Sequence, residues 1–425
     1  MANAFSKEER VAFDQVLEGF DDQLVMSKTV KVFKNDQTMM ARTNDIIWRP
    51  NKYIGLSYNG LDQTGNFKDQ TQLSVPARLN QYKSSPFALT ALELRDALQE
   101  NRLGDSAKQK LASDINVFIT NLAAQQGTLV VKRTVAASGY DDLAQADSIM
   151  NEQGVTAALG RRMAAFSSRD YNSMAGNLAG RQTINELPKT AYARAMVASN
   201  IAGFDVLKMD YAPRLNAATA TGVVVNGANQ FYTPVATTTD INGGGINVDN
   251  RYQTLPVTVG ASTIKVGDAF TITGVNAVHH ITKVDTGQLK TFRVTGIITG
   301  AGGTGTIQIS PPIISGQGGT VAELQYQNVT ATPAASAPIV FLNTQSAAVN
   351  PFWAESAIEL LPGRSEWPSD AGMQVMRAST DQGIEVTMVK QGDINTGLIK
   401  YRFDVFFGGV MNNPEACGIE LFSQT

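Results

Sequence analysis

Two histidines, one cysteine and one glycine-rich run are the residues of this 425-residue chain that most readily suggest chemistry. His279 and His280 are adjacent, and neighbouring side chains of an extended segment point to opposite faces, so we do not expect them to share a metal ion. Cys417 is the only cysteine, which excludes an intrachain disulfide and any zinc site built from several cysteines. A lone cysteine is by default a small buried apolar side chain. We therefore expect no metal site and no cofactor.

The run Gly300 to Gly305 matches the pattern G-x-G-x-x-G letter by letter. A dinucleotide-binding fingerprint needs a strand before this pattern and a helix after it, so that the helix N-terminus faces the pyrophosphate. Here the run is followed by TIQISPP, which is typical of a strand. The pattern therefore favours a glycine-rich hairpin. No nucleophile with a neighbouring base and orienting residue is recognisable either, so we expect no catalytic residue and no enzyme.

Short pairs of like charges offer two further kinds of chemistry. Acidic pairs could do acid–base work and basic pairs could contact phosphate, but both are also typical of solvated helix faces, which we favour. The acidic pairs are Asp21-Asp22 and Asp141-Asp142, and the basic pairs are Lys132-Arg133 and Arg161-Arg162.

Charge is distributed unevenly along the chain. Only 17% of the residues are charged, and the formal net charge is −3. Between Gly222 and Gln345 there are ten charged residues, and short Thr-rich stretches with β alternation are separated by Gly, Asn and Asp. We expect these stretches, and TVAELQYQ near the end of the segment, to be strands. This segment therefore predicts an inserted antiparallel β-barrel or sandwich. The near-neutral charge excludes a strong basic signal for nucleic acid.

No apolar run reaches the roughly 18 residues of a membrane span. The N-terminal segment also lacks the pattern of a secretory signal. We therefore expect no membrane partner and a cytosolic origin.

The flanks of this segment predict an α+β domain that the insertion splits. Ser6 to Glu9 fits a capping box, and Phe13, Val16, Leu17, Phe20 and Leu24 follow at helical spacing. Residues 46–84 predict a long two-stranded loop. Ser85-Pro86 predicts the start of one helix and Asp105 the cap of the next. A helix over 141–153, a strand and short helix near 156–178, and strands after residue 350 complete the pattern.

A glycine run, Asn242 to Gly245, lies between Asp240 and Asp249 and predicts a hairpin tip. Two interpretations stay open at this point. The run forms either a merely flexible loop or an arm that reaches a neighbouring subunit.

Several segments carry a resemblance to a known family: in chain order they are ELRDALQENRLGDSAKQKLASDINVFITNLAAQQGTLV, AGFDVLK, ATATG, INVDNRY, VNPFWAESAIEL, QGDI and NNPEACGIEL. They resemble segments of the major capsid proteins of tailed bacteriophages with the HK-97 fold, specifically the P22-like coat proteins. The first segment resembles the spine helix of these proteins and its lead-in, and the others follow in order. Together they cover most of the chain around an insertion of the expected size.

The resemblance implies an HK-97-type core with an inserted antiparallel β-barrel. By position, the parts are the N-arm 1–45, the E-loop 46–84, the spine-helix region 85–135, the axial domain 136–221, the barrel 222–345 and the C-terminal core 346–425. It also implies an icosahedral shell of hexamers and pentamers, assembled in the bacterial cytoplasm with scaffolding protein and portal, that becomes the virion capsid. Contact with packaged double-stranded DNA is then weak and non-specific.

The same resemblance implies that the long hairpin of the barrel contacts neighbouring capsomers by acid–base pairing. By position the acids are Asp240 or Asp249, and the candidate partner is Arg102. Lys52 and Lys68 in the E-loop are expected to be ordinary surface lysines. Two alternatives remain: an encapsulin-like shell, which would lack the insertion, and a bacterial enzyme or binding protein with a β accessory domain.

Overall fold

The structure is a computed structural model that describes most of the chain. The described residues are 7–33, 46–90, 97–155, 160–180, 201–209, 211–300, 302–367, 372–393 and 395–425, with some helical side chains excepted. Two compact units are present. The first comprises residues up to Ile47, Ala77–Thr120 and Glu359–Val410, and the second comprises Trp48–Pro76, Asn121–Ile358 and Met411–Thr425.

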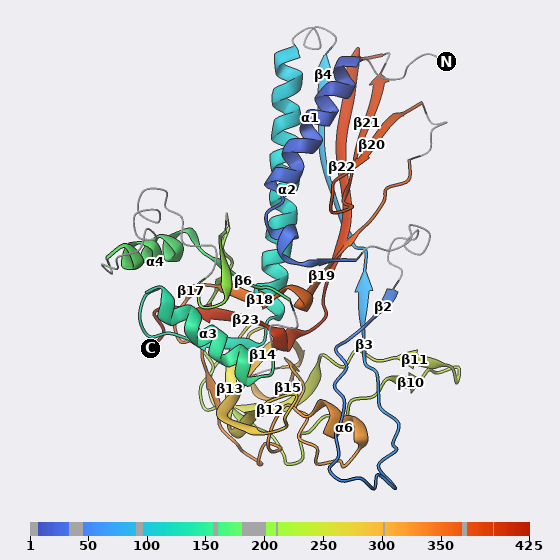
Figure 1. Ribbon diagram of the computed structural model, residues 1–425. Helices are drawn as coiled ribbons and strands as arrows, with labels where there is room; N and C mark the ends of the chain where they lie inside the picture. The colour runs from blue at the N-terminus through green and yellow to red at the C-terminus, as the bar shows by residue number, and fades with distance from the viewer. Residues whose placement is uncertain are drawn as a thin grey trace. The chain divides into compact units, whose positions relative to one another are not determined.

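The first unit packs helices against a mixed, mainly antiparallel sheet (Figure 1). Its helices are α1 (Lys7–Gln23), the short η1 (Met26–Thr29) and most of α2 (Ala97–Gln126). The sheet has the order β1 (Lys31–Val32), β19 (Ile358–Pro362), β22 (Leu398–Met411), β21 (Glu385–Asp393) and β20 (Gln374–Ser379), and β4 (Gln81–Thr90) also pairs with β22.

The helical stripe expected after residue 6 is confirmed as the buried face of α1. Phe13, Val16, Phe20 and Leu24 are all buried, and the Phe13 ring stacks on Phe403 of the sheet at 6.4 Å between centroids. Ser6, the expected cap, lies outside the described residues.

The expected helix start at Ser85-Pro86 is wrong, because residues 81–90 form strand β4. Exposure alternates along this strand, as it does when one face of a strand is covered. Ten consecutive residues pair with β22, from Gln81 opposite Phe407 to Thr90 opposite Leu398. Regular pairing over this length outweighs the local cap signal.

The expected boundary at Asp105 is also wrong, since α2 runs without a break from Ala97 to Gln126. Gly104 lies inside the helix instead of ending a preceding one. A Cβ at this position would be 3.3 Å from Val16 Cγ2, so the glycine permits the close approach of α1. Gly104 is therefore explained by the close packing of α1 against α2, not by the end of a helix.

The second unit contains a five-stranded mixed sheet and the inserted domain. The sheet has the order β5 (Leu129–Lys132), β23 (Cys417–Leu421), β18 (Asn350–Ala354), β6 (Arg162–Phe166) and β7 (Phe204–Lys208). The helical elements of this unit are α3 (Tyr140–Glu152), α4 (Ser168–Gly180), η4 (Glu355–Ala357) and η5 (Pro414–Ala416). Cys417 is fully buried, as expected.

Two short strands join the inserted domain to this sheet. The chain leaves through β8 (Arg214–Leu215) and returns through β17 (Ala347–Ala348), and the two strands pair antiparallel. Between them, six strands form one antiparallel sheet. Its order is β16 (Ile339–Phe341), β13 (Ala269–Val278), β14 (Asp285–Thr299), β15 (Gly303–Ser310), β12 (Gln253–Val259) and β9 (Val224–Val225).

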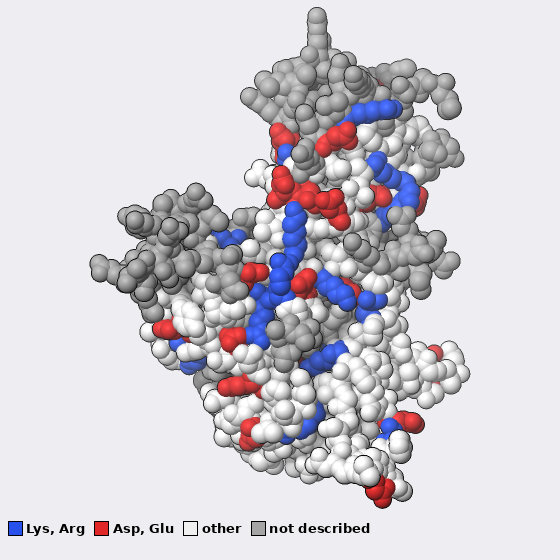
Figure 2. All heavy atoms as spheres, viewed as in Figure 1, with Lys and Arg blue, Asp and Glu red and all other residues white. Residues whose placement is uncertain are grey.

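The two edges of this sheet meet, so the inserted domain is a nearly closed barrel. Val225 N donates to Ala337 O at 3.0 Å, and Ile339 N donates to Val223 O at 2.9 Å. Inward-facing Val, Ile, Leu and Phe side chains fill the barrel. On the face shown in Figure 2, charged side chains over the barrel are isolated on a largely uncharged surface. The expected α+β class with an inserted antiparallel barrel is confirmed, whereas the exact boundaries 222 and 345 stay a prediction.

Two local expectations inside the barrel have different outcomes. The G-x-G-x-x-G run joins strand β14 to strand β15, so it is a hairpin as predicted, with Ala301 outside the described residues. The stretch TVAELQYQ, expected to be a strand, instead forms helix α6 (Val321–Tyr326). Thr320 caps this helix by accepting from Glu323 N at 3.2 Å, which is the start signal that the strand prediction missed.

Candidate assembly site

The glycine run of the barrel forms the tip of a projecting hairpin, residues 237–247, here called the hairpin arm (Figure 1). Strands β10 (Thr237–Thr239) and β11 (Gly245–Asn247) pair only with each other within the described chain, and all six of their residues are exposed. At the tip, Ile241 is 95% exposed and Gly243 has φ +81°. The expected hairpin is confirmed, and its exposure suits contact with another molecule.

The two acids on either side of the glycine run are in different situations: Asp240 is in the hairpin arm and Asp249 is at its base. Asp249 binds Arg251 in two parallel hydrogen bonds, from Nε to Oδ1 at 2.8 Å and from Nη2 to Oδ2 at 2.6 Å. Arg251 Nη1 also donates to Met411 O at 2.8 Å. Asp240 lies at the tip, where its Oδ1 accepts from Ile241 N at 2.6 Å. Asp249 is therefore held within its own chain, while the second carboxylate oxygen of Asp240 accepts no hydrogen bond from the described residues.

Arg102, the expected partner of these acids, belongs to α2. Its side chain lies outside the described part of that helix, so the pairing stays a prediction.

A second arm is the loop between β2 (Ile46–Pro50) and β3 (Ser74–Arg78), residues 51–73, here called the loop arm. Residues 81–84, also expected in this loop, belong instead to strand β4. Strands β2 and β3 pair with each other, which confirms a two-stranded loop over residues 46–78. Far from this pairing, the loop arm exposes Leu61 and Phe67 at 104% and 92% of their surface. Lys68 is exposed, as expected.

The base of the loop arm is fixed to the barrel. Thr71 N donates to Gln325 Oε1 at 3.0 Å, and Tyr326 OH donates to Thr71 O at 2.8 Å. Ser74 forms a parallel β-bridge with Asp249, the residue at the base of the hairpin arm. The bases of the two arms are thus joined to each other within the second unit.

Lys52 is the clearest correction to the sequence-based expectations. It was expected to be a surface lysine, but its side chain is only 20% exposed and its Nζ lies 3.7 Å from Glu415 Oε2. Glu415 lies in η5, far along the chain, so the sequence contains no local signal for this contact. Burial in a pocket next to a carboxylate outweighs the general tendency of lysine to face water.

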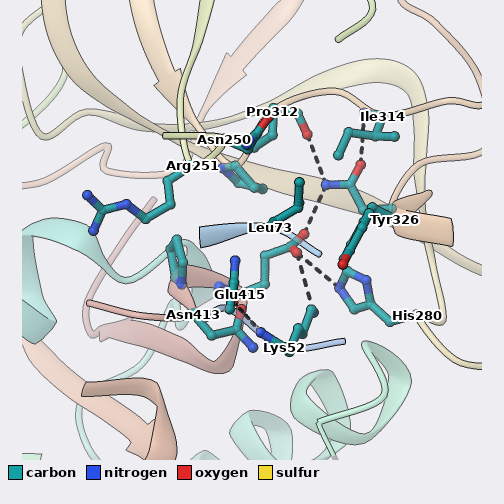
Figure 3. Close-up of a pocket in the computed structure, with 14 residues that line it drawn as sticks. Lys52, Leu73, Asn250, Arg251, His280, Pro312, Ile314, Tyr326, Asn413 and Glu415 are labelled. Atoms are coloured by element: carbon teal, nitrogen blue, oxygen red, sulfur yellow. Dashed lines mark hydrogen bonds and ion pairs between the residues drawn. The ribbon is translucent and has the colours of Figure 1, made fainter. Parts of the chain in front are cut away.

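Glu415 is the centre of a buried group here called the Glu415 cluster (Figure 3). Its Oε1 accepts from Lys290 Nζ at 2.8 Å and from Asn328 Nδ2 at 3.0 Å. Its Oε2 lies 3.3 Å from His280 Nε2 and faces Lys52. The cluster therefore joins the loop arm, three barrel segments and the C-terminal part of the chain through one carboxylate.

Burial and neighbouring charge shift the pKa values of this cluster strongly. Burial lowers the pKa of His280 well below its usual value; the charge of Glu415 opposes this shift, and the neighbouring lysines reinforce it. Burial alone would raise the pKa of Glu415, but the charges of Lys290 and Lys52, and that of His280 whenever it is protonated, hold it well below the usual range. Burial, together with the charge of Lys52, lowers the pKa of Lys283 to about 8. A neutral histidine and an ionised glutamate are thus favoured at neutral pH.

The two histidines are placed in a turn after β13, not in the strand-like run expected. His279 Nδ1 accepts from Thr282 N at 3.1 Å, whereas His280 is 3% exposed and faces Glu415. No group of three or more His, Cys, Asp or Glu side chains that could hold a metal ion occurs among the described residues.

Some of the like-charged pairs are buried, contrary to the expectation of solvated faces. Asp142 is fully buried, binds Arg133 at 2.7 Å and accepts from Gly139 N at 2.9 Å. Arg162 is 9% exposed, pairs with Asp147 and donates to a backbone carbonyl. These charges are buried because each finds an opposite charge and hydrogen-bond partners nearby.

Three other members of the pairs, Asp22, Asp141 and Arg161, face solvent as expected. Asp22 and Asp141 are exposed, Arg161 is 61% exposed, and Asp21 forms a surface ion pair with Lys28 at 3.1 Å. No helix in the described part of the chain is long and apolar enough to cross a membrane.

Comparisons with known proteins show which family the chain is similar to. The sequence profile of the family described as "P22 coat protein - gene protein 5" matches residues 1–423. Among solved structures, the chain is similar to the CUS-3 coat protein I-domain, with 44% identity over 28% of this chain and 95% of that chain, at a TM-score of 0.23. It is also similar to a structure from Mycobacterium phage Che8, with 9% identity over 94% of this chain and 92% of that chain, at a TM-score of 0.41.

The profile match covers the HK-97-type core and the insertion together, which decides against an encapsulin-like shell and against an enzyme with an accessory domain. The chain is a structural protein of the phage capsid, and its place is the virion. It belongs to the P22 coat protein family.

Proposed function

We propose that this chain assembles with a scaffolding protein and a portal protein into a procapsid of hexamers and pentamers in the bacterial cytoplasm. The procapsid then matures into the icosahedral head that encloses double-stranded DNA. The observation that carries the proposal is the hairpin arm, a two-stranded ribbon whose strand residues are all exposed. An isolated ribbon of this kind is only marginally stable in water, so a partner surface accounts for its persistence.

The hairpin arm contacts a neighbouring capsomer in this proposal. Asp240 is the acid offered to the neighbour, because Asp249 is already bound to Arg251 within its own chain. Arg102 of the neighbouring copy is the proposed basic partner. The ion pair lies near the surface, so it contributes up to about 1 kcal/mol per contact, and its effect accumulates over the many copies of a shell.

Packaged DNA is held without sequence specificity in this proposal. The net charge of −3 supports weak contact, because tight binding to DNA requires many unneutralised Lys and Arg side chains on one face. Such contact weakens as the salt concentration rises, since it depends on the release of counterions from DNA.

Expression with and without a phage scaffolding protein tests the assembly proposal. Sedimentation and electron microscopy should show closed shells when the scaffolding protein is present. Soluble monomers under every condition would contradict it. Asp240→Ala in the same system tests the hairpin arm: shells should form less readily or dissociate at lower temperature, while the monomer unfolds at the wild-type temperature.

A further inference from the structure

A pocket opens beside the Glu415 cluster, within the second unit (Figure 3). Its wall combines the start of the loop arm, the turn at Asn250 and Arg251, the segment around Pro312 and the η5 turn. Lys52, His280 and Glu415 all line it. The pocket is therefore polar and is built from segments that are distant in sequence.

Positive charge in this pocket exceeds negative charge. Lys52, Lys283 and Lys290 lie close enough to influence one another, and Glu415 is the one carboxylate that acts on Lys52 and Lys283 within the described chain. Arg251 adds no net charge because Asp249 neutralises it. Lys52 and Lys290 share the one carboxylate of Glu415. Lys283 Nζ donates to the backbone carbonyls of Gln325 at 2.8 Å and Gln327 at 3.2 Å and adds a third positive charge nearby. Buried charge of this kind is costly without a counter-charge.

The lysines share Glu415 unequally. Lys290 takes the short contact of 2.8 Å with Oε1 and a further bond of 2.6 Å to Gln153 Oε1. Lys52 Nζ stays 3.7 Å from Oε2, which is beyond hydrogen-bond distance. Burial lowers the pKa of Lys52; the charge of Glu415 opposes this shift, and the charge of Lys290 reinforces it.

Buried polar atoms in the same wall also lack partners. Asn413 is 7% exposed, and its Nδ2 donor has no hydrogen-bond acceptor in the described structure. His280 is 3% exposed, and its Nδ1 is likewise unpaired among the described residues. Both residues line the pocket, as Figure 3 shows. Most buried donors in proteins are paired, so an unpaired donor beside an undercompensated ammonium points to an absent acceptor.

We propose that this pocket binds a small oxyanion of the phosphate type, held by Lys52 Nζ and Asn413 Nδ2. Lys283 and Lys290 supply the surrounding positive field. Glu415 competes with the anion, because it is the internal counter-charge of the same lysines. Occupation of the pocket would link the base of the loop arm more firmly to the barrel and to η5.

Titration of the full-length monomer with inorganic phosphate tests this proposal. Phosphate should raise the thermal unfolding temperature in a saturable way, beyond the effect of sodium chloride at equal ionic strength, and phosphorus NMR should show a bound signal. Lys52→Met should weaken the phosphate affinity by about tenfold or more, since a hydrogen bond to a charged group is lost. Lys265→Met is the matched control, because Lys265 is an exposed lysine of the same barrel.

Glu415→Gln separates a binding site from a merely structural cluster. Without the competing carboxylate the variant should bind phosphate more tightly than the wild type, and phosphate should restore part of its lost stability. If phosphate acts no better than chloride on the wild type and on Glu415→Gln, the proposal is wrong. It is also wrong if Lys52→Met and Lys265→Met respond alike.

A further arm of the experiment identifies the source of the phosphate group. A short single-stranded oligonucleotide, added in place of phosphate, tests whether a phosphodiester can enter the pocket. We expect no displacement of bound phosphate by the oligonucleotide, because the lining residues are largely buried. Displacement that Lys52→Met abolishes would overturn the assignment to a free anion.

Discussion

Asp249 holds Arg251 through two parallel hydrogen bonds, of 2.8 and 2.6 Å, at the base of an arm whose tip carries a second acid, Asp240. This geometry is the strongest form of an Arg–carboxylate pair. One acid is thus engaged within the subunit, and the other is the acid for which we propose a contact with a neighbour. The two acids, equivalent by sequence position, are not equivalent in the structure.

Asp249→Asn should therefore lower the stability of the monomer, whereas Asp240→Asn should lower the stability of the shell and leave the monomer nearly unchanged. Asp249→Asn leaves Arg251, whose side chain is 9% exposed, without its counter-charge and should destabilise the monomer by about 2 to 3 kcal/mol. Asp240→Asn changes an acid at the tip and should alter monomer stability by less than about 0.5 kcal/mol. Urea unfolding of the monomer measures both values.

Shell stability provides the second half of this comparison. Asp240→Asn shells should dissociate at a lower temperature than wild-type shells, and the difference should shrink at high salt because screening weakens a surface ion pair. Equal shell stability for Asp240→Asn and wild type at low salt would contradict the role proposed for the tip acid.

Lowering the pH should reduce the free energy of unfolding in two steps, because two groups of the Glu415 cluster have shifted pKa values. The pKa of His280 is well below 6.5 when folded, so the unfolded chain takes up a proton first, and stability falls as the pH drops below about 6.5. The pKa of Glu415 is also depressed, so its contribution is present above about pH 4.5 and is lost as the pH falls through the folded value. Thermal unfolding measured from about pH 7 downwards should show both losses.

His280→Gln should remove the step that begins near pH 6.5 and leave the lower one. His279→Gln is the matched control, since His279 lies in the same turn and does not contact Glu415 in the described structure. An unchanged pH profile for His280→Gln would show that His280 does not titrate on unfolding as inferred.

Glu420 should give the opposite pH dependence. It is buried in β23, and burial raises its pKa well above the usual value, with Asp142 and Asp170 acting in the same direction. Its contribution is therefore present below about pH 4.5 and is lost as the pH rises through the folded value. Glu420→Gln keeps the shape and removes the titration, so the variant should gain stability relative to wild type as the pH increases.

Differential scanning at several pH values tests this prediction. Glu152→Gln, a change at an exposed position of α3, is the control and should follow the wild-type profile. A constant difference between Glu420→Gln and wild type across the pH range would mean that Glu420 keeps an ordinary pKa.

The sequence predicts those parts of the fold that depend on a repeated local pattern. The apolar spacing from Phe13 to Phe20 identifies the buried face of α1, and β alternation identifies most barrel strands. The prediction fails where distant pairing decides, as at Pro86, which lies opposite Arg402 in a ten-residue ladder. It also fails in α6, where alternation was given more weight than the Thr320 cap.

The buried charges show the same limit more clearly. Lys52 and Glu415 each resemble ordinary surface residues in sequence, and only the folded chain brings them together. The hairpin with its two acids could be located from the sequence, but the pairing of Asp249 with Arg251 could not be distinguished from an intermolecular pairing. Charge partners are set by three-dimensional proximity, which a single sequence does not reveal.

Substitutions of two neighbouring glycines at the tip of the hairpin arm can test whether the turn must be formed in the monomer before shells assemble. Gly243 has φ +81°, in the left-handed region where an L-residue costs about 1 to 2 kcal/mol, and its amide donates to Asp240 O at 2.9 Å. Gly244 has no such φ, and a Cβ there meets nothing within 4 Å. Gly243→Ala should therefore speed hydrogen exchange in residues 237–247 and weaken shells, while Gly244→Ala should leave both near wild type. If both variants assemble as wild type although exchange is faster only in Gly243→Ala, the arm orders on contact and its turn need not be preformed.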